Sequence, residues 1–215
     1  PHSEYIVWID ADAWLQNDLC LQHAIAVAKQ DKLAVVSQAT RLQKNHITMR
    51  RSWLGFIECR GILFKNAKRA GLPKKIVDDL MVRPVLNAGF YALKTKASHW
   101  SIWHKLQSEL ALKGRIFSSD QLSLAIAIYL EKLPYEALSD VCNYMGPWRY
   151  DTDQKKFTDL YYPYQPVSLV HMAGVDKSNP VSQGVDQYGN QIELQLSFSK
   201  QDENSEQGRN QIQSS

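Results

Sequence analysis

The sequence has 215 residues, which is enough for one domain with a sizeable hydrophobic core. Hydrophobic residues make up 44% of it and charged residues 22%, a balance that excludes a chain disordered throughout. No run reaches the roughly 18 consecutive apolar residues that a membrane-spanning helix needs.

The net charge of +3 is unevenly distributed. From Arg41 to Arg83 there are 11 Lys and Arg residues against three Asp and Glu residues. This basic segment predicts an anionic partner, either an acidic membrane surface or a phosphate-bearing molecule. The alternative is a solvated helix surface, and we do not expect a nucleic-acid partner.

The three cysteines lack the spacing of a metal site, and the sequence contains no Asn-x-Ser/Thr glycosylation signal. Both features favour a reducing, cytoplasmic location, with membrane association through the basic segment. The chain begins at Pro1 and a strand-like run starts at Tyr5, so we interpret it as a fragment with further sequence upstream. A signal or anchor in that upstream part stays unknown.

Alternating strand and helix patterns open the chain. Residues 5–9 form a short apolar run rich in β-formers, which predicts a buried strand that ends at Asp10. Residues 18–29 follow the capping residue Asn17 and predict a helix, and residues 33–36 predict the next strand. Strand, helix and strand in this order favour an α/β fold with parallel strands.

The middle of the chain predicts a long helix and then a strand. Residues 47–70 carry a helix-like apolar face that includes Trp53 and Phe56, and Gly71 ends the pattern before a proline. Residues 85–93 predict an apolar strand.

Two further helices and a final strand complete the predicted core. Ser98 can cap one helix, and a second is predicted over residues 120–131. Residues 167–170 predict a short strand that ends at His171. We therefore assign residues 1–181 to one core domain.

The residues after the core are mostly polar. We predict that residues 182–215 form a polar C-terminal tail that is largely disordered. Alternating apolar residues near Leu194 allow an edge strand within it, whereas residues 200–215 are almost free of apolar side chains.

The strongest chemical signal is the pair of carboxylates that follows the first strand. Asp10 and Asp12 stand one residue apart at its carboxyl end, where α/β sheets bind their ligands. Two such carboxylates can hold a divalent cation, which can bind a diphosphate. The same pattern recurs at Asp151 and Asp153 in a polar loop with no strand before it, and we interpret that copy as solvated surface.

His171 repeats the placement at a strand end. Imidazole binds manganese-like ions beside carboxylates, although a lone histidine is more often structural. Gly174 and Lys177 follow it: glycine permits close backbone approach to a ligand, and lysine offers a positive charge for phosphate.

Two further segments indicate a functional site only in combination with Asp10, Asp12 and His171. Asn87, Ala88 and Gly89 interrupt an apolar strand, which indicates either a β-bulge or a polar contact to a sugar hydroxyl. Asp120 and Gln121 open a predicted helix, where an acidic residue is ordinary unless the sheet brings it to the cation.

The ordered set resembles the retaining glycosyltransferases of family 8, which include glycogenin and bacterial lipopolysaccharide galactosyltransferases. The resemblance spans about residues 5 to 180. The matching residues are Asp10, Ala11, Asp12, Asn87, Ala88, Gly89, Asp120, Gln121, Leu133, Pro134, His171, Gly174 and Lys177.

The resemblance implies the GT-A nucleotide-diphospho-sugar transferase fold, an α/β fold with a mixed, mostly parallel sheet flanked by helices. The N-terminal nucleotide-binding part of that fold would be largely missing. It also implies a hexosyltransferase that moves a sugar from a UDP-sugar to a saccharide or glycan acceptor with retention.

The resemblance implies roles for the matched residues as well. Asp10, Asp12 and His171 would bind Mn²⁺ or Mg²⁺, and Lys177 would contact the diphosphate. The remaining residues would line the donor site or act on the sugar: Asp10, Ala11, Asn87, Ala88, Gly89 and Gly174 in binding, and Gln121 and Asp120 in catalysis.

Two alternatives remain open at this point. A phosphatase of the haloacid-dehalogenase type also has a strand that ends in Asp-x-Asp, with Asp10 as nucleophile and Asp78 and Asp79 in support. A non-catalytic module that binds a sugar nucleotide would need the same cation site without transfer.

Overall fold

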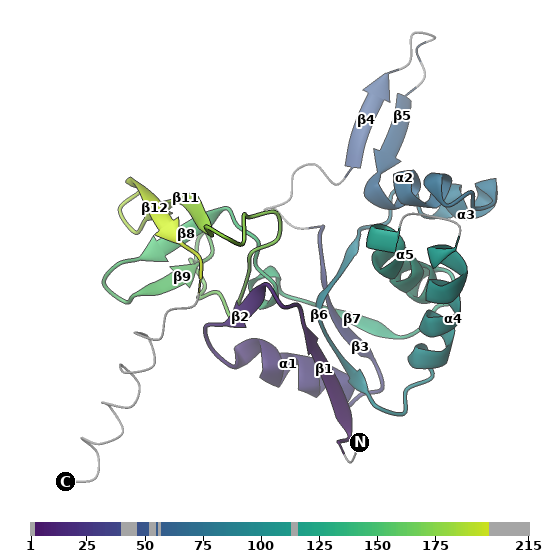
Figure 1. Cartoon of the computed structure of the whole chain (residues 1–215), viewed down its shortest axis with the longest axis horizontal. Coiled ribbons are helices and arrows are strands. Elements are labelled where there is room, and N and C mark those ends of the chain that lie inside the picture. Colours follow the sequence, from purple (N-terminus) through teal and green to yellow (C-terminus); the bar gives the residue numbers. More distant parts are fainter. Residues whose placement is uncertain (1–2, 40–46, 52–54, 56, 113–115, 198–215) are drawn as a thin grey trace.

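We describe the protein from a computed structural model, which covers residues 3–39, 47–51, 55, 57–112 and 116–197. Its centre is a four-stranded sheet in the order β1-β6-β3-β7 (Figure 1). These strands are β1 (Tyr5–Ile9), β3 (Leu33–Ser37), β6 (Leu86–Lys94) and β7 (Tyr135–Leu138). The α/β class is therefore confirmed.

The sheet is mixed, but the expectation of mostly parallel strands is wrong. β6 runs antiparallel to both β1 and β3, and only β3 and β7 are parallel. The reason is a long excursion of the chain between β3 and β6 that leaves and rejoins the sheet at the same end. The backbone N–H of Gln38 donates to the carbonyl of Val85 (2.8 Å), so β6 must run back alongside β3.

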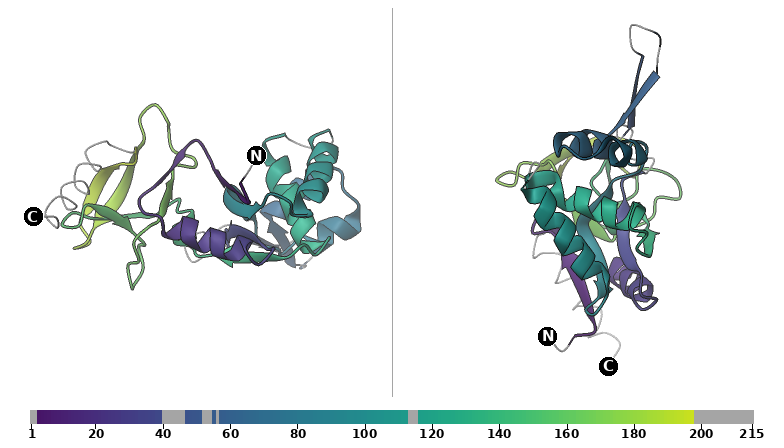
Figure 2. Two further views of the ribbon diagram at one scale, coloured as in Figure 1. Left: turned by 90° about the horizontal axis from the view of Figure 1, so that it is seen from below. Right: turned by 90° about the vertical axis from the view of Figure 1, so that its right-hand side faces the viewer.

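Helices cover both faces of this sheet (Figure 2). Side chains of β3 alternate between the faces, as a strand requires. Ala34 and Val36 pack with α1 (Leu19–Ala28) on one side. Leu33 and Val35 pack on the other side with the layer of α4 (His99–Ala111) and α5 (Ile116–Tyr129).

The predicted helix over residues 47–70 is wrong for its first two thirds. The chain there forms an antiparallel pair, β4 (Ile47–Arg51) and β5 (Ile57–Gly61), which projects from the body (Figure 1). Gly55 between the strands has φ +83°, a left-handed conformation that interrupts a helix and suits a turn. Trp53 and Phe56, expected on the helix face, lie outside the described residues.

Helical structure begins only after this pair. α2 (Ile62–Arg69) and α3 (Lys74–Asp79) follow, and Gly71 with φ +64° ends α2 as predicted. Leu63 and Val77 from these helices pack with the side chains of α5 in a separate apolar cluster.

The polar tail predicted from residue 182 needs correction over its first half. β11 (Val181–Asp186) and β12 (Gln191–Gln195) pair with each other, and β11 also pairs with β8 (Trp148–Asp151). With β9 (Lys156–Thr158) they form a second sheet in the order β12-β11-β8-β9. The predicted edge strand is thus β12, because the alternating apolar residues bury against Trp148 and Phe157. Residues 200–215 lie outside the described residues.

A short strand pair joins the two sheets. β2 (Ala13–Leu15) pairs antiparallel with β10 (Leu169–His171), which is fully buried and corresponds to the predicted final strand. A single 3-10 turn, η1 (Asp140–Cys142), precedes the segment that bonds to β10 on its other side. Within the part of the chain described, no helix has the length and apolar character to cross a membrane.

Candidate metal centre

Backbone hydrogen bonds bring three segments distant in sequence to one place. Asp10 directly follows β1, and its backbone N–H donates to the carbonyl of Gly89 in β6 (2.9 Å). Asp12 directly precedes β2, and its carbonyl accepts the N–H of Met172 (2.9 Å), the residue after His171. The strand pair β2–β10 therefore places His171 beside the two aspartates.

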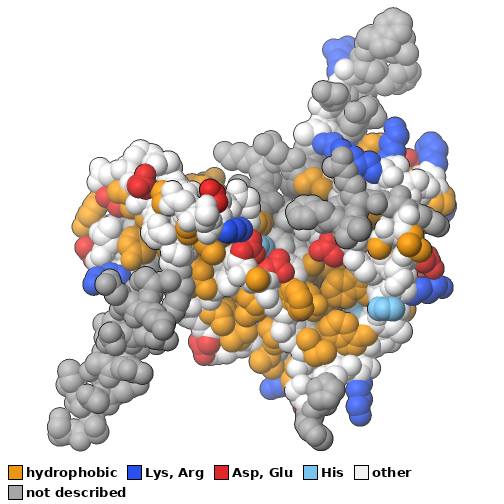
Figure 3. All heavy atoms as spheres, viewed as in Figure 1, with side chains coloured by type: hydrophobic (Ala, Val, Ile, Leu, Met, Phe, Trp, Pro, Cys, Tyr) orange, Lys and Arg blue, Asp and Glu red, His pale blue; other side chains and the backbone are white. Residues whose placement is uncertain are grey.

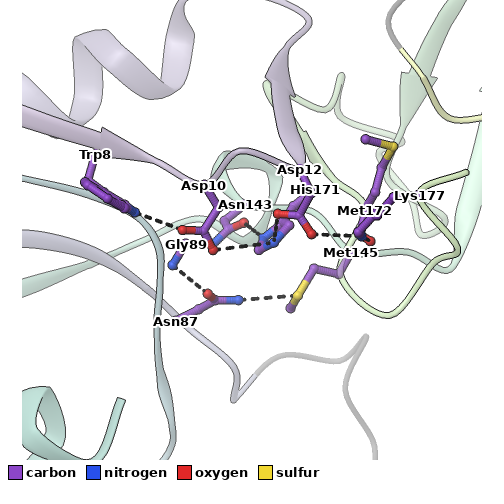
Figure 4. Close-up of polar contacts among 10 residues, drawn as sticks. All are labelled: Trp8, Asp10, Asp12, Asn87, Gly89, Asn143, Met145, His171, Met172 and Lys177. Carbon is purple, nitrogen blue, oxygen red and sulfur yellow. Dashed lines mark hydrogen bonds and ion pairs between the residues drawn. The ribbon is translucent and has the colours of Figure 1, made fainter. Parts of the chain in front are cut away.

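The side chains of Asp10, Asp12 and His171 converge as predicted (Figure 4). Their potential ligand atoms all lie within 4.8 Å of one another. The Nε2 atom of His171 is 3.2 Å from Oδ1 of Asp12 and 3.8 Å from Oδ2 of Asp10. Two carboxylates and one imidazole at these separations can hold a divalent cation.

The two carboxylates are each held by another side chain. The indole N–H of Trp8 donates to Oδ1 of Asp10 (2.8 Å), and the ammonium of Lys177 lies 2.8 Å from Oδ2 of Asp12. Lys177 also donates to the backbone carbonyl of Met172. These contacts leave Oδ2 of Asp10 and Oδ1 of Asp12 directed at His171.

The imidazole of His171 contacts Asn143 on the side away from the carboxylates. Its Nδ1 atom lies 2.7 Å from Oδ1 of Asn143, and both side chains are buried, with 5% of His171 and 2% of Asn143 exposed. The carboxylates are more open, since 40% of the Asp10 side chain and 28% of the Asp12 side chain are exposed. The site is therefore buried on the imidazole side and accessible on the carboxylate side.

The electrostatics favour the cation-binding forms of these groups at neutral pH. Burial lowers the pKa of His171 below its usual range, against the opposing effect of Asp12 and Asp10, so the ring is neutral. For Asp12, desolvation acts to raise the pKa, but the hydrogen bond from Lys177 and the positive charge of that ammonium outweigh it, so the pKa is lowered. A neutral imidazole and an ionised carboxylate are the forms that bind metals.

Gly89 forms the floor of the site, and only glycine fits there. A Cβ at this position would lie 2.6 Å from Cε1 of His171 and 2.9 Å from Oδ2 of Asp10. The bulge considered for this strand is also present, because the register between β3 and β6 shifts opposite residues 88–90. Glycine therefore allows the strand to pass directly against the ligands.

Asn87 and Ala88 are largely buried in the same strand. The side-chain oxygen of Asn87 accepts a hydrogen bond from the backbone N–H of Gly89 (2.9 Å). The side-chain nitrogen of Asn87 lies 3.3 Å from the sulfur of Met145. Ala88 packs in the apolar cluster beneath α5. The contact of Asn87 with a sugar hydroxyl stays a prediction.

Asp120 lies close enough to the site to interact with it electrostatically. Burial raises its pKa, and the charge of Asp10 adds to the increase. Its Oδ1 atom is buried and has no hydrogen-bond partner within the described residues. Gln121 follows on α5 and is half-buried.

The loop after β10 carries the remaining predicted residues. Gly174 has φ +77° with open space around it, and the loop returns Lys177 to Asp12. Ala11 is exposed between the two aspartates. Asp78 and Asp79, which the phosphatase alternative needs, lie on α3 and pair with lysines one turn earlier.

Two residues of the site were not predicted from the sequence. Trp8 could have been found, because side chains two residues apart in a strand share a face and Trp8 precedes Asp10 by two. Asn143 carries no such signal, since it follows a short 3-10 turn and meets His171 only through the tertiary fold.

Comparisons with known proteins do not assign the chain to a class. It matches no protein-family model, no curated protein and no solved structure. What the fold and the site themselves define is an α/β protein with a candidate centre for a divalent cation.

Proposed function

We propose that this protein is a metal-dependent glycosyltransferase with a GT-A fold that transfers a hexose from a UDP-sugar to a saccharide or glycan acceptor. The observation that carries the proposal is the convergence of Asp10, Asp12 and His171, with Lys177 beside them. The same four residues are those for which the family 8 resemblance implies cation and diphosphate binding.

The donor set and its surroundings fit Mn²⁺ or Mg²⁺. The ligand atoms are two carboxylate oxygens and a neutral imidazole nitrogen, and the close approach of Gly89 leaves room for them to converge. When bound, such a cation supplies Lewis-acid stabilisation of the charge on a leaving diphosphate.

The chain's own residues supply the rest of the proposed chemistry. Lys177, which lies within 2.8 Å of Asp12, places a positive charge next to the cation site, where it can bind a phosphate oxygen. The half-exposed carboxylates of Asp10 and Asp12 leave one side of the site open to a diphosphate.

Asp120 and Gln121 are proposed to act on the donor sugar. Burial and the charge of Asp10 raise the pKa of Asp120, and its buried Oδ1 atom has no hydrogen-bond partner among the residues that the structure describes, as expected for a group that faces a ligand. Its carboxylate or the side-chain carbonyl oxygen of Gln121 would stabilise positive charge on the anomeric carbon from the face opposite the acceptor. That placement predicts retention, so an α-linked donor should give an α-linked product in the anomeric couplings of an NMR spectrum, and a β-linked product would contradict it.

The proposal is tested by thermal stability. We expect UDP to raise the melting temperature clearly only when Mn²⁺ is present, because a diphosphate needs the cation to bridge it to the carboxylates. The matched measurement is turnover of p-nitrophenyl phosphate. Phosphatase activity without stabilisation by UDP would favour the dehalogenase-type alternative, whereas stabilisation without transfer would favour a binding module.

We also propose that the basic segment from Arg41 to Arg83 contacts an anionic partner through α2. Lys65, Lys68 and Arg69 on α2 are exposed, and Figure 3 shows Lys and Arg side chains gathered beside the projecting strand pair. Binding to anionic rather than neutral lipid vesicles, lost at high salt, would support a membrane partner. Equal binding to both would exclude it and leave a phosphate-bearing acceptor.

A further inference from the structure

We propose that Asn143 is a positioning residue that prepares His171 for cation binding by holding the imidazole proton on Nδ1. The inference rests on the proposed metal-dependent function. It adds a residue that no motif in the sequence marks and that the family resemblance does not supply.

The backbone fixes Asn143 firmly beneath the histidine. The N–H of Asn143 donates to the carbonyl of Asp140 in η1 (3.0 Å). The next residue, Tyr144, exchanges hydrogen bonds with β10: its N–H donates to Leu169 and its carbonyl accepts the N–H of His171, each at 2.9 Å. Asn143 and His171 are thus held by neighbouring backbone segments, and their side chains meet at 2.7 Å.

The chemistry of the pair selects one tautomer. A neutral imidazole has one N–H, and the carbonyl oxygen of Asn143 can only accept a hydrogen bond. In the proposed tautomer the proton resides on Nδ1 and is accepted by Asn143 rather than by Asp12, whose Oδ1 lies 3.2 Å from Nε2, and the lone pair of Nε2 faces the two carboxylates. If the amide nitrogen of Asn143 faced the ring instead, the proton would move to Nε2 and block the cation.

Burial makes this selection depend on Asn143 itself. Only 2% of Asn143 and 5% of His171 are exposed, so bulk water would not replace the hydrogen bond between them if Asn143 were substituted. The amide Nδ2 of Asn143 is also buried and has no hydrogen-bond partner within the residues that the structure describes. The Oδ1 atom of the same amide contacts Nδ1 of His171, so orienting the imidazole is a role that this buried amide can serve.

The first experiment measures the tautomer directly, without any cation. In protein labelled with ¹⁵N-histidine, long-range proton–nitrogen correlations distinguish Nδ1–H from Nε2–H. We expect the Nδ1–H pattern for His171, identified by its disappearance in His171→Gln. A dominant Nε2–H pattern in the wild-type protein would overturn the proposal, whatever the variants do.

The second experiment measures Mn²⁺ affinity by electron paramagnetic resonance. We expect Asn143→Ala to mix the tautomers and to weaken Mn²⁺ binding by about 10- to 100-fold. Asn143→Asp keeps an acceptor at the same place, so it should retain the Nδ1–H pattern and recover most of the affinity. Asn190→Ala, in the exposed turn between β11 and β12, is the control and should change neither quantity.

The outcomes separate this proposal from the function on which it rests. A folded Asn143→Ala protein with unchanged tautomer and unchanged Mn²⁺ affinity would overturn the role of Asn143. If that variant does not fold, the wild-type spectrum and Asn143→Asp still decide. A wild-type protein that binds no Mn²⁺ would refute the proposed function, and the tautomer alone would then decide the role of Asn143.

Discussion

Two copies of the pattern Asp-x-Asp occur in this chain, at residues 10–12 and at residues 151–153, and they have different surroundings. In the second copy, Oδ1 of Asp151 accepts the backbone N–H groups of Asp153 (3.1 Å) and Gln154 (2.8 Å) in the turn between β8 and β9. Asp153 is exposed, with Tyr188 as a distant partner at 3.4 Å. The Asp151 carboxylate therefore stabilises its own turn.

The first copy faces groups from other parts of the chain. Trp8 contacts one oxygen of Asp10, and Lys177 contacts one oxygen of Asp12. The other oxygen of each carboxylate points to His171. The three-residue pattern is therefore not itself a site. A cation site needs carboxylates whose remaining oxygens are aimed by tertiary contacts at a third ligand.

Removing one carboxylate from each copy should give the largest contrast. We expect Asp12→Ala to weaken Mn²⁺ binding by at least about 100-fold, equal to about 2.7 kcal/mol, because a charged ligand is lost. Asp153→Ala is the matched control and should bind Mn²⁺ like the wild type. The measurement is isothermal titration with both variants checked by circular dichroism, and equal affinities in the two variants would remove the distinction between the copies.

Adding one methyl group at Gly89, next to the first copy, should reduce both stability and Mn²⁺ affinity. In Gly89→Ala the new Cβ would lie 2.6 Å from the imidazole of His171, so the ring or β6 must shift. We expect a loss of about 1–3 kcal/mol of folding free energy from overpacking, together with weaker Mn²⁺ binding. Urea unfolding measures the first quantity, and unchanged stability with unchanged affinity would show that the ligands do not converge as described.

Lowering the pH should gradually weaken Mn²⁺ binding at the first copy. Because the pKa of His171 is lowered, protons compete with the cation only below the usual histidine range. Mn²⁺ affinity should be constant from pH 8 to about pH 6.5 and then fall by up to about tenfold per pH unit. Titration in a series of buffers checks this, and a decline that begins above pH 7 would contradict a lowered pKa.

The smallest effect is expected in the second copy. Asp151→Ala removes the acceptor for two backbone N–H groups at a partly exposed turn, which should cost about 1 kcal/mol of folding free energy. Mn²⁺ affinity should not change. A drop in affinity would mean that this turn, and not only the first copy, takes part in cation binding.

The sequence predicts the parts of the fold that are determined locally. β1, α1, β3 and β6 follow from apolar periodicity and capping, and so does the position of the aspartates at the end of β1. The antiparallel direction of β6 does not follow, because it depends on where the excursion between β3 and β6 rejoins the sheet. The β4–β5 pair was missed because its apolar spacing also fits a helix.

The same division holds for the candidate site. Asp10, Asp12 and His171 were predicted because each stands at a strand end, and their convergence is confirmed. Asn143 was not, because its role comes from a backbone bridge between its segment and β10 that leaves no local pattern. The roles of Asn87 and Gln121 toward a sugar stay predictions.

The strand pair β2–β10 gives the site a mechanical role besides its chemical one. It joins Asp12 to His171 across a loop of about 160 residues, so a cation bound there would act as a removable cross-link between early and late parts of the chain. Like a disulfide across a long loop, it would restrict the unfolded state as well as stabilise the folded one. A chelator would then change the unfolding cooperativity of the whole core, not only the chemistry at its edge.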